Sequence, residues 1–226
     1  MIIAMDGPAG VGKSTVGGLV AKALGYKFIN TGEMYRALTW RALEESVDLD
    51  DLGAVVALAK RLAWEFKPVE EGGITLKTFL DGVPVTGQIR EERVSVNSSR
   101  VAENPGVRKF LSKLQRELGE EGAIVMEGRD ITTHVFPDAD VKIYLDASPE
   151  ERATRRHRQL KAAGQDVDRN AILAAILKRD LNDIKREINP LKRASDAMII
   201  DSTRMTMHEV AESILRRVRR GKKDAR

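Results

Sequence analysis

Short apolar runs alternate along the chain with longer segments in which apolar residues recur at helical spacing. The runs occupy residues 1–5, 26–29, 123–126, 141–145 and 197–200. Short, largely apolar runs are typical of strands buried on both faces, and the segments between them predict helices. The pattern therefore predicts an α/β fold with a three-layer architecture, in which a five-stranded parallel sheet carries helices on both faces.

The segment from Trp64 to residue 90 departs from this pattern. Residues 74–80 and 83–85 form two β-like runs, and Asp81-Gly82 between them is a two-residue hairpin signal. We therefore expect a core of residues 1–63 and 91–226, interrupted at 64–90 by a small antiparallel β-hairpin insertion.

Several helix boundaries are marked in the sequence. Thr31 is a candidate N-cap for a helix that runs to about Glu45, and Ser148-Pro149-Glu150-Glu151 matches a capping box. Asp168 is expected to cap a long helix that reaches about Ile188. Further helices are predicted at 13–24, from 50–51, at 91–103, from 105 to about 118 and at 207–218.

The long helix carries two different faces. Arg179, Asp183 and Arg186 are spaced i, i+4, i+7 and share one face. A roughly opposite apolar stripe, typical of a helix that packs on a core, is formed by Leu173, Ile176, Leu177, Leu181, Ile184 and Ile188. The charged face fits either a solvated surface with salt bridges or a functional site, and the helix alone does not decide between them.

The first predicted strand leads into a phosphate-binding motif. The motif G-x-x-x-x-G-K-[ST] is formed by Gly7, Pro8, Ala9, Gly10, Val11, Gly12, Lys13, Ser14 and Thr15. In such a loop backbone N–H groups surround an anion, Lys13 reaches the β- and γ-phosphates, and Ser14 offers a hydroxyl to Mg²⁺. The order strand, glycine loop, helix favours this function over a glycine-rich turn that binds nothing.

Composition narrows the setting of the protein. The chain has 226 residues and no Cys, so it has neither a disulfide framework nor a thiolate metal site. No signal peptide or membrane span is recognised, which predicts a cytoplasmic protein without a membrane partner. The net charge of +4 includes a basic segment at 216–223. This segment is expected to be a solvated helix end and a frayed tail, because no aromatic residues that could stack on nucleic-acid bases interleave its charges.

The class of phosphate-binding protein follows from what accompanies the loop. The N-K-x-D motif of GTPases is missing, whereas arginine is abundant at Arg36, Arg100, Arg108, Arg129, Arg152, Arg155, Arg156, Arg158, Arg179 and Arg186. Transfer of a phosphoryl group to a phosphorylated acceptor requires charge neutralisation on both substrates, which arginine forks provide. A small kinase therefore fits best. A kinase for another small acceptor and a nucleic-acid-dependent ATPase are the alternatives.

The chain resembles the bacterial-type cytidylate kinases of the P-loop nucleoside monophosphate kinase family. The resemblance rests on residues 6–15, Thr31-Gly32-Glu33-Met34-Tyr35-Arg36, 94–108, Gly128-Arg129-Asp130, 135–139, 142–156, 179–191 and 197–203. It covers nearly the whole length, and the combination of these motifs is far more specific than any one of them. By this resemblance, the hairpin at 64–90 belongs to the monophosphate-binding insertion, and residues from about 150 to 168 form a lid.

The resemblance implies that the protein phosphorylates CMP and dCMP with ATP and Mg²⁺. Arg36, Arg129 and Arg186 would then hold the acceptor phosphate, in a motif that also contains Thr31 and Tyr35. Cytosine would be contacted by Ser99, Arg108 and Asp130, and the ribose by Asp183 and Arg179. Around ATP, the lid would contribute Arg152, Arg155, Arg156 and Arg158. Charge on the transferred group would be stabilised by Lys13, Arg129, Arg186, Arg152 and Arg155.

The implied chemistry is in-line transfer without a covalent enzyme intermediate. An acceptor phosphate is already nucleophilic at neutral pH, so no general base is needed. The scattered His134, His157 and His208 are accordingly expected to be structural or exposed. A monomer without a nucleic-acid partner is expected.

Overall fold

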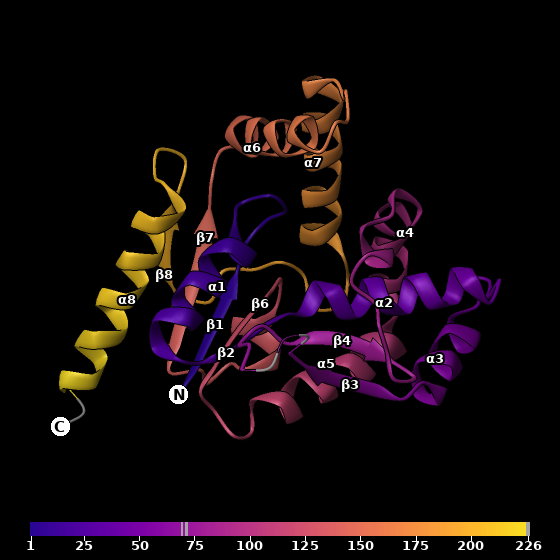
Figure 1. Ribbon diagram of the computed structural model, residues 1–226, viewed down its shortest axis with the longest axis horizontal. Coiled ribbons are helices and arrows are strands. Elements are labelled where there is room, and N and C mark those ends of the chain that lie inside the picture. Colours follow the sequence, from indigo (N-terminus) through magenta and orange to yellow (C-terminus); the bar gives the residue numbers. More distant parts are fainter. Residues whose placement is uncertain (69, 71, 225–226) are drawn as a thin grey trace.

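The computed structural model, which describes residues 1–68, 70 and 72–224, is built on a five-stranded parallel sheet (Figure 1). Every neighbouring pair in this sheet runs parallel. The order across it is β2 (Lys27–Asn30), β6 (Ile124–Gly128), β1 (Ile2–Asp6), β7 (Val141–Asp146) and β8 (Met198–Asp201). The predicted fold class is confirmed, and each predicted strand is found within about two residues of its expected bounds.

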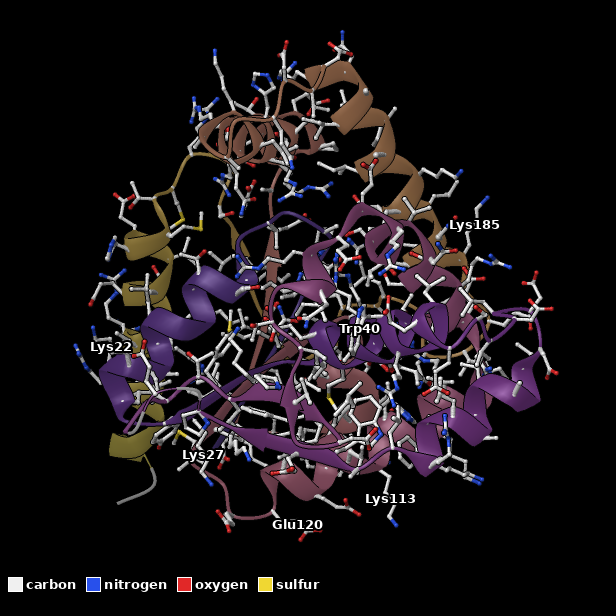
Figure 2. All side chains as sticks on the ribbon, turned by 45° about the vertical axis from the view of Figure 1, so that its right-hand side comes forward. Lys22, Lys27, Trp40, Lys113, Glu120 and Lys185 are labelled. Atoms are coloured by element: carbon white, nitrogen blue, oxygen red, sulfur yellow. The ribbon has the colours of Figure 1, made fainter. Side chains whose placement is uncertain are left out.

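Alternate side chains of the central strand β1 enter two different cores. Ile3 and Met5 pack against α1 (Lys13–Leu24) and α8 (Met207–Asp224) on one face of the sheet. Ala4 faces the other core, formed with α2 (Thr31–Glu44), α3 (Leu52–Arg61) and α5 (Pro105–Gly119). The period of two that defines a strand thus produces the three layers. Charged side chains such as Lys22, Lys113 and Glu120 lie on the outside of these helices (Figure 2).

Helix α2 begins directly at the end of β2. The Asn30 side chain accepts a hydrogen bond from the Gly32 amide at 2.9 Å, so Asn30 caps the helix. The prediction of Thr31 as the cap is wrong by one residue. The Thr31 hydroxyl instead donates to the Glu127 carbonyl oxygen at 2.8 Å and joins α2 to the neighbouring strand β6.

The insertion is an antiparallel sheet of three strands, ordered β3 (Trp64–Lys67), β4 (Lys77–Leu80) and β5 (Val83–Pro84). The predicted hairpin turn is confirmed, with Asp81 at φ 52° and Gly82 at φ 77°. Strand β3 was not predicted. Strand β4 begins at Lys77 instead of Ile74, because Ile74 and Leu76 form backbone hydrogen bonds with Phe28 in the main sheet. After the insertion come η1 (Gln88–Arg90) and α4 (Glu92–Glu103).

Helices α6 (Pro149–Ala162) and α7 (Arg169–Lys185) project beyond the sheet (Figure 1). Ser148 caps α6, but only half of the predicted capping box forms. The Ser148 amide donates to the Thr203 hydroxyl at 2.9 Å, and the Glu151 carboxylate pairs with Arg155. The hydrogen bond from the Ser148 amide to Thr203 thus replaces the one to Glu151 that a complete capping box would contain.

Helix α7 differs from its prediction in two ways. It ends at Lys185 rather than near Ile188, so Arg186 lies just past the helix, with ψ 141°. The predicted apolar stripe is only partly buried: Ile176 is buried against α6, and Leu173 is partly buried beside it. The exposed fractions of the remaining side chains are 49% for Leu177, 49% for Leu181, 55% for Ile184 and 37% for Ile188. Because α7 stands clear of the sheet, the described residues provide no layer that covers this side.

The C-terminal helix is longer than predicted. Helix α8 continues through Asp224, where an end at Val218 and a frayed tail were expected. Val218 is buried, and Arg216, Arg217, Arg219 and Arg220 are exposed, as the predicted solvated face requires. Residues 225–226 lie outside the described residues. Within the described part of the chain, no helix has the length and apolar character needed to span a membrane.

Candidate active site

The loop between β1 and α1 requires glycine at defined positions. Gly7 has φ +151°, and a Cβ atom there would lie 2.0 Å from the Leu145 carbonyl oxygen of the adjacent strand. Gly12 has φ +98° and caps α1 without a side chain. These conformations bring the loop backbone round the N-terminus of α1, where N–H groups and the helix dipole favour an anion.

Lys13 is buried inside this loop. Its Nζ donates to the carbonyl oxygens of Gly7 and Pro8, both at 2.7 Å. Burial and the positive charge of Arg129 lower the pKa of Lys13 to about 7, although the negative charge of Glu127 opposes the shift. Burial and Arg129 both disfavour the protonated form of the amine. An anionic phosphate beside Lys13 would favour that form, because its negative charge would compensate the positive charge.

A polar group at the start of α1 offers oxygen ligands for a cation. The Ser14 hydroxyl donates to the carboxylate of Glu127, which is buried at the end of β6. The Asn30 side-chain amide donates to the Ser14 hydroxyl oxygen at 3.2 Å. Hydroxyl and carboxylate oxygens are ligands that Mg²⁺ accepts. Among the described residues, no group of three or more His, Cys, Asp or Glu side chains forms a metal cluster.

A buried ion pair joins α5 to the turn that follows β6. Arg108 on α5 donates through Nη2 to Asp130 at 2.6 Å, and both side chains are almost fully buried. The ring of Tyr35 lies 5.6 Å from the Arg108 guanidinium, and burial raises the pKa of Tyr35 to about 12. The Arg108 Nε is buried and has no hydrogen-bond partner in the described structure. The pair therefore retains one unused donor.

A second set of ion pairs lies beside the first. Arg129 donates to Asp183 at 2.8 Å, and Arg186 lies 3.7 Å from both Asp130 and Asp183. Burial opposes the charge of Asp183, but the guanidiniums of Arg129, Arg179 and Arg186 outweigh it and lower the pKa of Asp183. Burial and the charge of Arg129 lower the pKa of Arg179 to about 10. Positive charge exceeds negative charge here, as a phosphate site requires.

Arg36 approaches this cluster from α2. Its Nη1 donates to the Ile89 carbonyl oxygen at 3.0 Å and to the Ser95 hydroxyl at 2.7 Å. Burial lowers the pKa of Arg36, and the positive charges of Arg156 and Arg129 lower it further. The cluster thus combines arginines from α2, the turn after β6 and the end of α7, with Arg156 of α6 close enough to affect it.

Arg152 forms hydrogen bonds with the phosphate loop and with α7. It is buried, and its guanidinium donates to the carbonyl oxygens of Ala147 at 3.0 Å and Ala9 at 2.9 Å, and to Asp180 at 2.6 Å. Asp180 in turn accepts from the Ala9 amide at 3.3 Å. The Arg152–Asp180 pair therefore attaches α6 and α7 to the phosphate loop.

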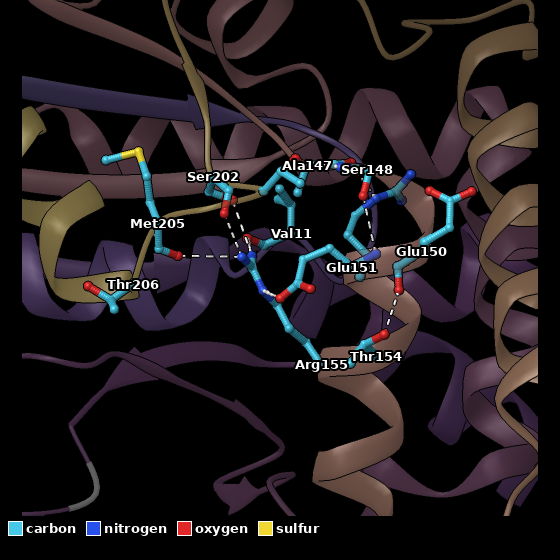
Figure 3. A network of polar contacts seen from close by, with 12 residues as sticks. Val11, Ala147, Ser148, Glu150, Glu151, Thr154, Arg155, Ser202, Met205 and Thr206 are labelled. Atoms are coloured by element: carbon cyan, nitrogen blue, oxygen red, sulfur yellow. Dashed lines mark hydrogen bonds and ion pairs between the residues drawn. The ribbon is translucent and has the colours of Figure 1, made fainter.

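Arg155 also contacts the phosphate-loop region (Figure 3). Its guanidinium donates to the carbonyl oxygens of Val11 and Ser202 and to the Ser202 hydroxyl, the last at 3.1 Å. Arg156 is exposed and donates to Gln159 at 2.8 Å. Of the four predicted lid arginines, Arg152 and Arg155 thus reach the loop, whereas Arg156 and Arg158 are exposed.

The remaining predicted residue is Ser99, which is half-buried on α4. Among the described residues, no hydrogen bond joins its side chain to the Arg108–Asp130 pair. The four residues that sequence reasoning left without a role are Asp6, Asn30, Glu127 and Asp180. The first three end parallel strands, where ligands of α/β sheets bind, so a signal for them was present. Asp180 carried no comparable signal, because its contact with Ala9 exists only in three dimensions.

Together these features define a phosphotransferase of the P-loop kinase class. A glycine loop with a buried lysine and a separate cluster of arginines and carboxylates both lie at the carboxyl ends of one parallel sheet. Such an arrangement suits two phosphorylated molecules that must lie close to each other for direct phosphoryl transfer.

The chain belongs to the cytidylate kinase family: the family model described as "Cytidylate kinase" matches residues 3–220. The chain is similar to the cytidylate kinase of Bacillus velezensis, with 47% identity over 94% of each chain. It is similar to that of Bacillus subtilis, with 45% identity over 96% of this chain and 95% of the other. It is also similar to the cytidylate kinase of Pseudomonas aeruginosa PAO1, with 44% identity over 97% of this chain and 95% of the other.

Among solved structures, an uncharacterized protein from Eubacterium ventriosum has a TM-score of 0.50 at 12% identity, covering 96% of this chain and 98% of that one. This likeness concerns the fold alone. The predicted family is confirmed, and membership in it favours a kinase over a nucleic-acid-dependent ATPase.

Proposed function

We propose that the protein transfers the γ-phosphoryl group of ATP to CMP and dCMP, giving ADP and CDP or dCDP. One observation carries the proposal: in a chain of the cytidylate kinase family, the buried Arg108–Asp130 pair lies next to the cluster formed by Arg129, Asp183 and Arg186. In this proposal the first pair binds the base and the cluster binds the phosphate, so that the two groups match the two ends of a nucleoside monophosphate.

The charge pattern of the first pair suits cytosine. Cytosine presents acceptors at O2 and N3 and a donor at its N4 amine, whereas uracil has a donor at N3 and an acceptor at O4. Arg108 has only donors, and its Nε is unused; the ionised Asp130 can only accept. In uracil, the N3–H donor would face the donors of Arg108, and the O4 acceptor would face the carboxylate of Asp130. In a buried site these unpaired groups would lower the affinity for uracil. Ser99 completes the proposed base contacts, because a hydroxyl both donates and accepts.

The adjacent cluster is assigned to the rest of the acceptor. Arg36, Arg129 and Arg186 would bind its phosphate, since guanidinium forks match phosphate oxygens. Asp183 and Arg179 would contact the ribose. Thr31 and Tyr35 line the same side, where the Thr31 hydroxyl ties α2 to β6 and the Tyr35 ring covers Arg108.

The phosphate loop is assigned to ATP. Its N–H groups and Lys13 would hold the β- and γ-phosphates, and Ser14 with Glu127 would hold Mg²⁺, whose other ligands would be water and phosphate oxygens. Bound there, Mg²⁺ neutralises phosphate charge. Arg155 contacts both the loop and Ser202, which suits a nucleotide contact.

The chain itself contributes positioning and electrostatic stabilisation. A phosphate monoester is already ionised and nucleophilic near neutral pH, so the residues need only align it with the γ-phosphoryl group. Arg156 of the lid and Arg129 of the acceptor cluster supply positive charge between the two substrates. Arg152, whose guanidinium is bonded to two carbonyls and Asp180, holds the lid helices against the loop.

We propose that the enzyme acts as a monomer. A cytoplasmic location with ATP as donor, and no nucleic-acid or membrane partner, completes the proposal. Light scattering at working concentration tests the monomer: a mass near 25.1 kDa is expected, and a stable dimer would contradict it.

The proposed activity is tested with a panel of acceptors. ADP release from ATP and Mg²⁺ is followed with CMP, dCMP, UMP, AMP, GMP or shikimate, one at a time. We expect kcat/KM to be highest for CMP and dCMP, with UMP weaker by about 100-fold or more. A preference for a purine nucleotide or for shikimate would contradict the proposal, as would ATP hydrolysis that needs a polynucleotide and no acceptor.

A further inference from the structure

Asp6, the last residue of β1, is a fully buried carboxylate that the mechanism above does not use. Its Oδ1 accepts from the Ile131 amide at 2.9 Å, and its Oδ2 accepts from the Thr132 amide at 2.7 Å and the Thr132 hydroxyl at 2.6 Å. Burial raises the pKa of Asp6 to about 6, although these hydrogen bonds oppose the shift. Burying an ionisable carboxyl group costs free energy, so its presence here suggests that Asp6 has a specific role.

The hydrogen bonds of Asp6 end on the helix that follows the base-binding acid. Ile131 and Thr132 are the first residues of η2 (Ile131–Val135), a single π-helical turn that begins directly after Asp130. Their amides are among those that a helix leaves without intrahelical partners, and the side chain of the N-cap residue usually accepts from such amides.

Asp130 holds the N-cap position of η2 but makes no side-chain capping hydrogen bond. Its carboxylate points away from the helix to Arg108, at 2.6 Å, and lies 3.7 Å from Arg186. Asp is a strongly preferred capping residue, so a free Asp130 would have a competing local conformation in which it caps its own helix. Asp6 accepts the hydrogen bonds that would otherwise favour that conformation.

We propose that Asp6 is a positioning residue that caps η2 in place of Asp130 and so keeps the Asp130 carboxylate directed into the acceptor site. The proposal rests on the assignment of Asp130 to the base of the acceptor. It makes Asp6 a determinant of base specificity, although Asp6 itself touches no substrate. Because Gly7 follows Asp6 directly, the same residue also fixes the acceptor site relative to the phosphate loop.

The proposal predicts a selective defect in Asp6→Asn. The amide keeps the shape and one acceptor but presents a donor to Thr132, so one N–H of η2 loses its partner and Asp130 is drawn toward the helix. We expect KM for CMP to rise about ten-fold, which corresponds to the loss of one such interaction, while KM for ATP stays within about two-fold. The preference for CMP over UMP should fall, because Asp130 no longer faces the amine.

Three further variants separate positioning from general stability. Thr132→Val keeps Asp6 and removes only the hydroxyl contact, so it should shift KM for CMP in the same direction by a smaller factor, and Thr132→Ser should restore it. Asp140→Asn is the matched control: Asp140 accepts from the Ile2 amide at 2.7 Å at the opposite end of β1 and is exposed. This control should change neither KM nor the base preference.

The experiment measures kcat and KM for CMP, UMP and ATP in the wild-type and variant enzymes, at a temperature where circular dichroism shows each to be folded. A higher KM for CMP with a reduced CMP preference supports the proposal. Equal effects on CMP and ATP, or an unchanged ratio of CMP to UMP, would overturn it. If Asp6→Asn does not fold, the proposal is tested by whether Thr132→Val raises KM for CMP and whether Thr132→Ser restores it. Failure of the wild-type enzyme to use CMP would count against the proposed function instead, since it involves no variant.

Discussion

The donor side and the acceptor side of the site are built by different means. The donor side is one continuous loop, residues 7–15, in which Lys13 is held by the carbonyls of its own loop. The acceptor side gathers side chains from distant segments, and its arginines are held by acids: Arg108 by Asp130 and Arg129 by Asp183. Backbone geometry therefore defines the first, and side-chain electrostatics define the second.

This difference determines how each side tolerates change. In the loop, a glycine carries a conformation that no other residue adopts without strain, and one lysine carries the charge. In the acceptor cluster, charge is abundant, so the geometry of each guanidinium matters more than its charge alone.

Lys13→Ala should have the largest effect. The loop keeps its backbone but loses the charge that stabilises the transferred phosphoryl group, so single-turnover transfer should fall by at least about 100-fold. Lys22→Ala on the outer side of α1 is the control and should be unaffected (Figure 2). Thermal melting verifies the fold, and near-normal transfer by a folded Lys13→Ala protein would refute the assignment of the loop.

Arg129→Lys should follow, although it preserves the charge. Lys cannot form a fork that bonds Asp183 and a phosphate together, and a misplaced phosphate should cost on the order of 100-fold in kcat/KM for CMP. Arg100→Lys, at an exposed arginine paired with Asp50, is the matched control. An unchanged kcat/KM in Arg129→Lys would mean that Arg129 has only a structural role.

A smaller effect is expected in the proton balance of ATP binding. Because the pKa of Lys13 is lowered to about 7, its amine is mostly neutral above that pH, and bound phosphate should raise the pKa again. At about pH 8, binding should therefore take up close to one proton, as measured by calorimetry in buffers with different ionisation enthalpies. Lys13→Arg should show no uptake, because a guanidinium stays charged. Binding of ATP to the wild-type enzyme without proton uptake would contradict the shifted pKa.

Removal of residues after Arg220 should have the least effect. Val218, the last residue of α8 known to be buried, is retained, so the packing of this helix on the sheet is preserved. We expect kcat/KM for CMP and the melting temperature to be unchanged within error. A large loss of kcat/KM in a stable truncated protein would show that the basic end takes part in the reaction.

The sequence was sufficient for the donor side and for the sheet. The motif at residues 7–15 is local, so its loop and the following helix could be predicted together. The five strands were predictable because a strand covered by helices on both faces is apolar throughout. Prediction also brought Arg108, Arg129, Asp130, Asp183 and Arg186 into one cluster through the family resemblance, and the structure places them together.

What the sequence did not predict depends on tertiary contacts. The stripe of Leu177, Leu181 and Ile184 has the spacing of a buried face, yet α7 stands away from the sheet and leaves it exposed. The hydrogen bonds of Arg152 with Asp180 and with two carbonyl oxygens were not predicted either. Periodicity and residue type do not reveal which neighbours a side chain will meet.

The role of Arg108 is the most direct test of the acceptor site. We would measure kcat/KM for CMP and UMP in the wild-type enzyme and in Arg108→Met, with Arg100→Met as control and Asp130→Asn as a second variant if loss of the buried pair prevents folding. The account predicts that Arg108→Met lowers kcat/KM for CMP at least about ten-fold more than for UMP, because only cytosine offers Arg108 an acceptor at N3. An equal decrease for both substrates would contradict it, since Arg108 would then contribute to folding or uniform binding and not to recognition of the base.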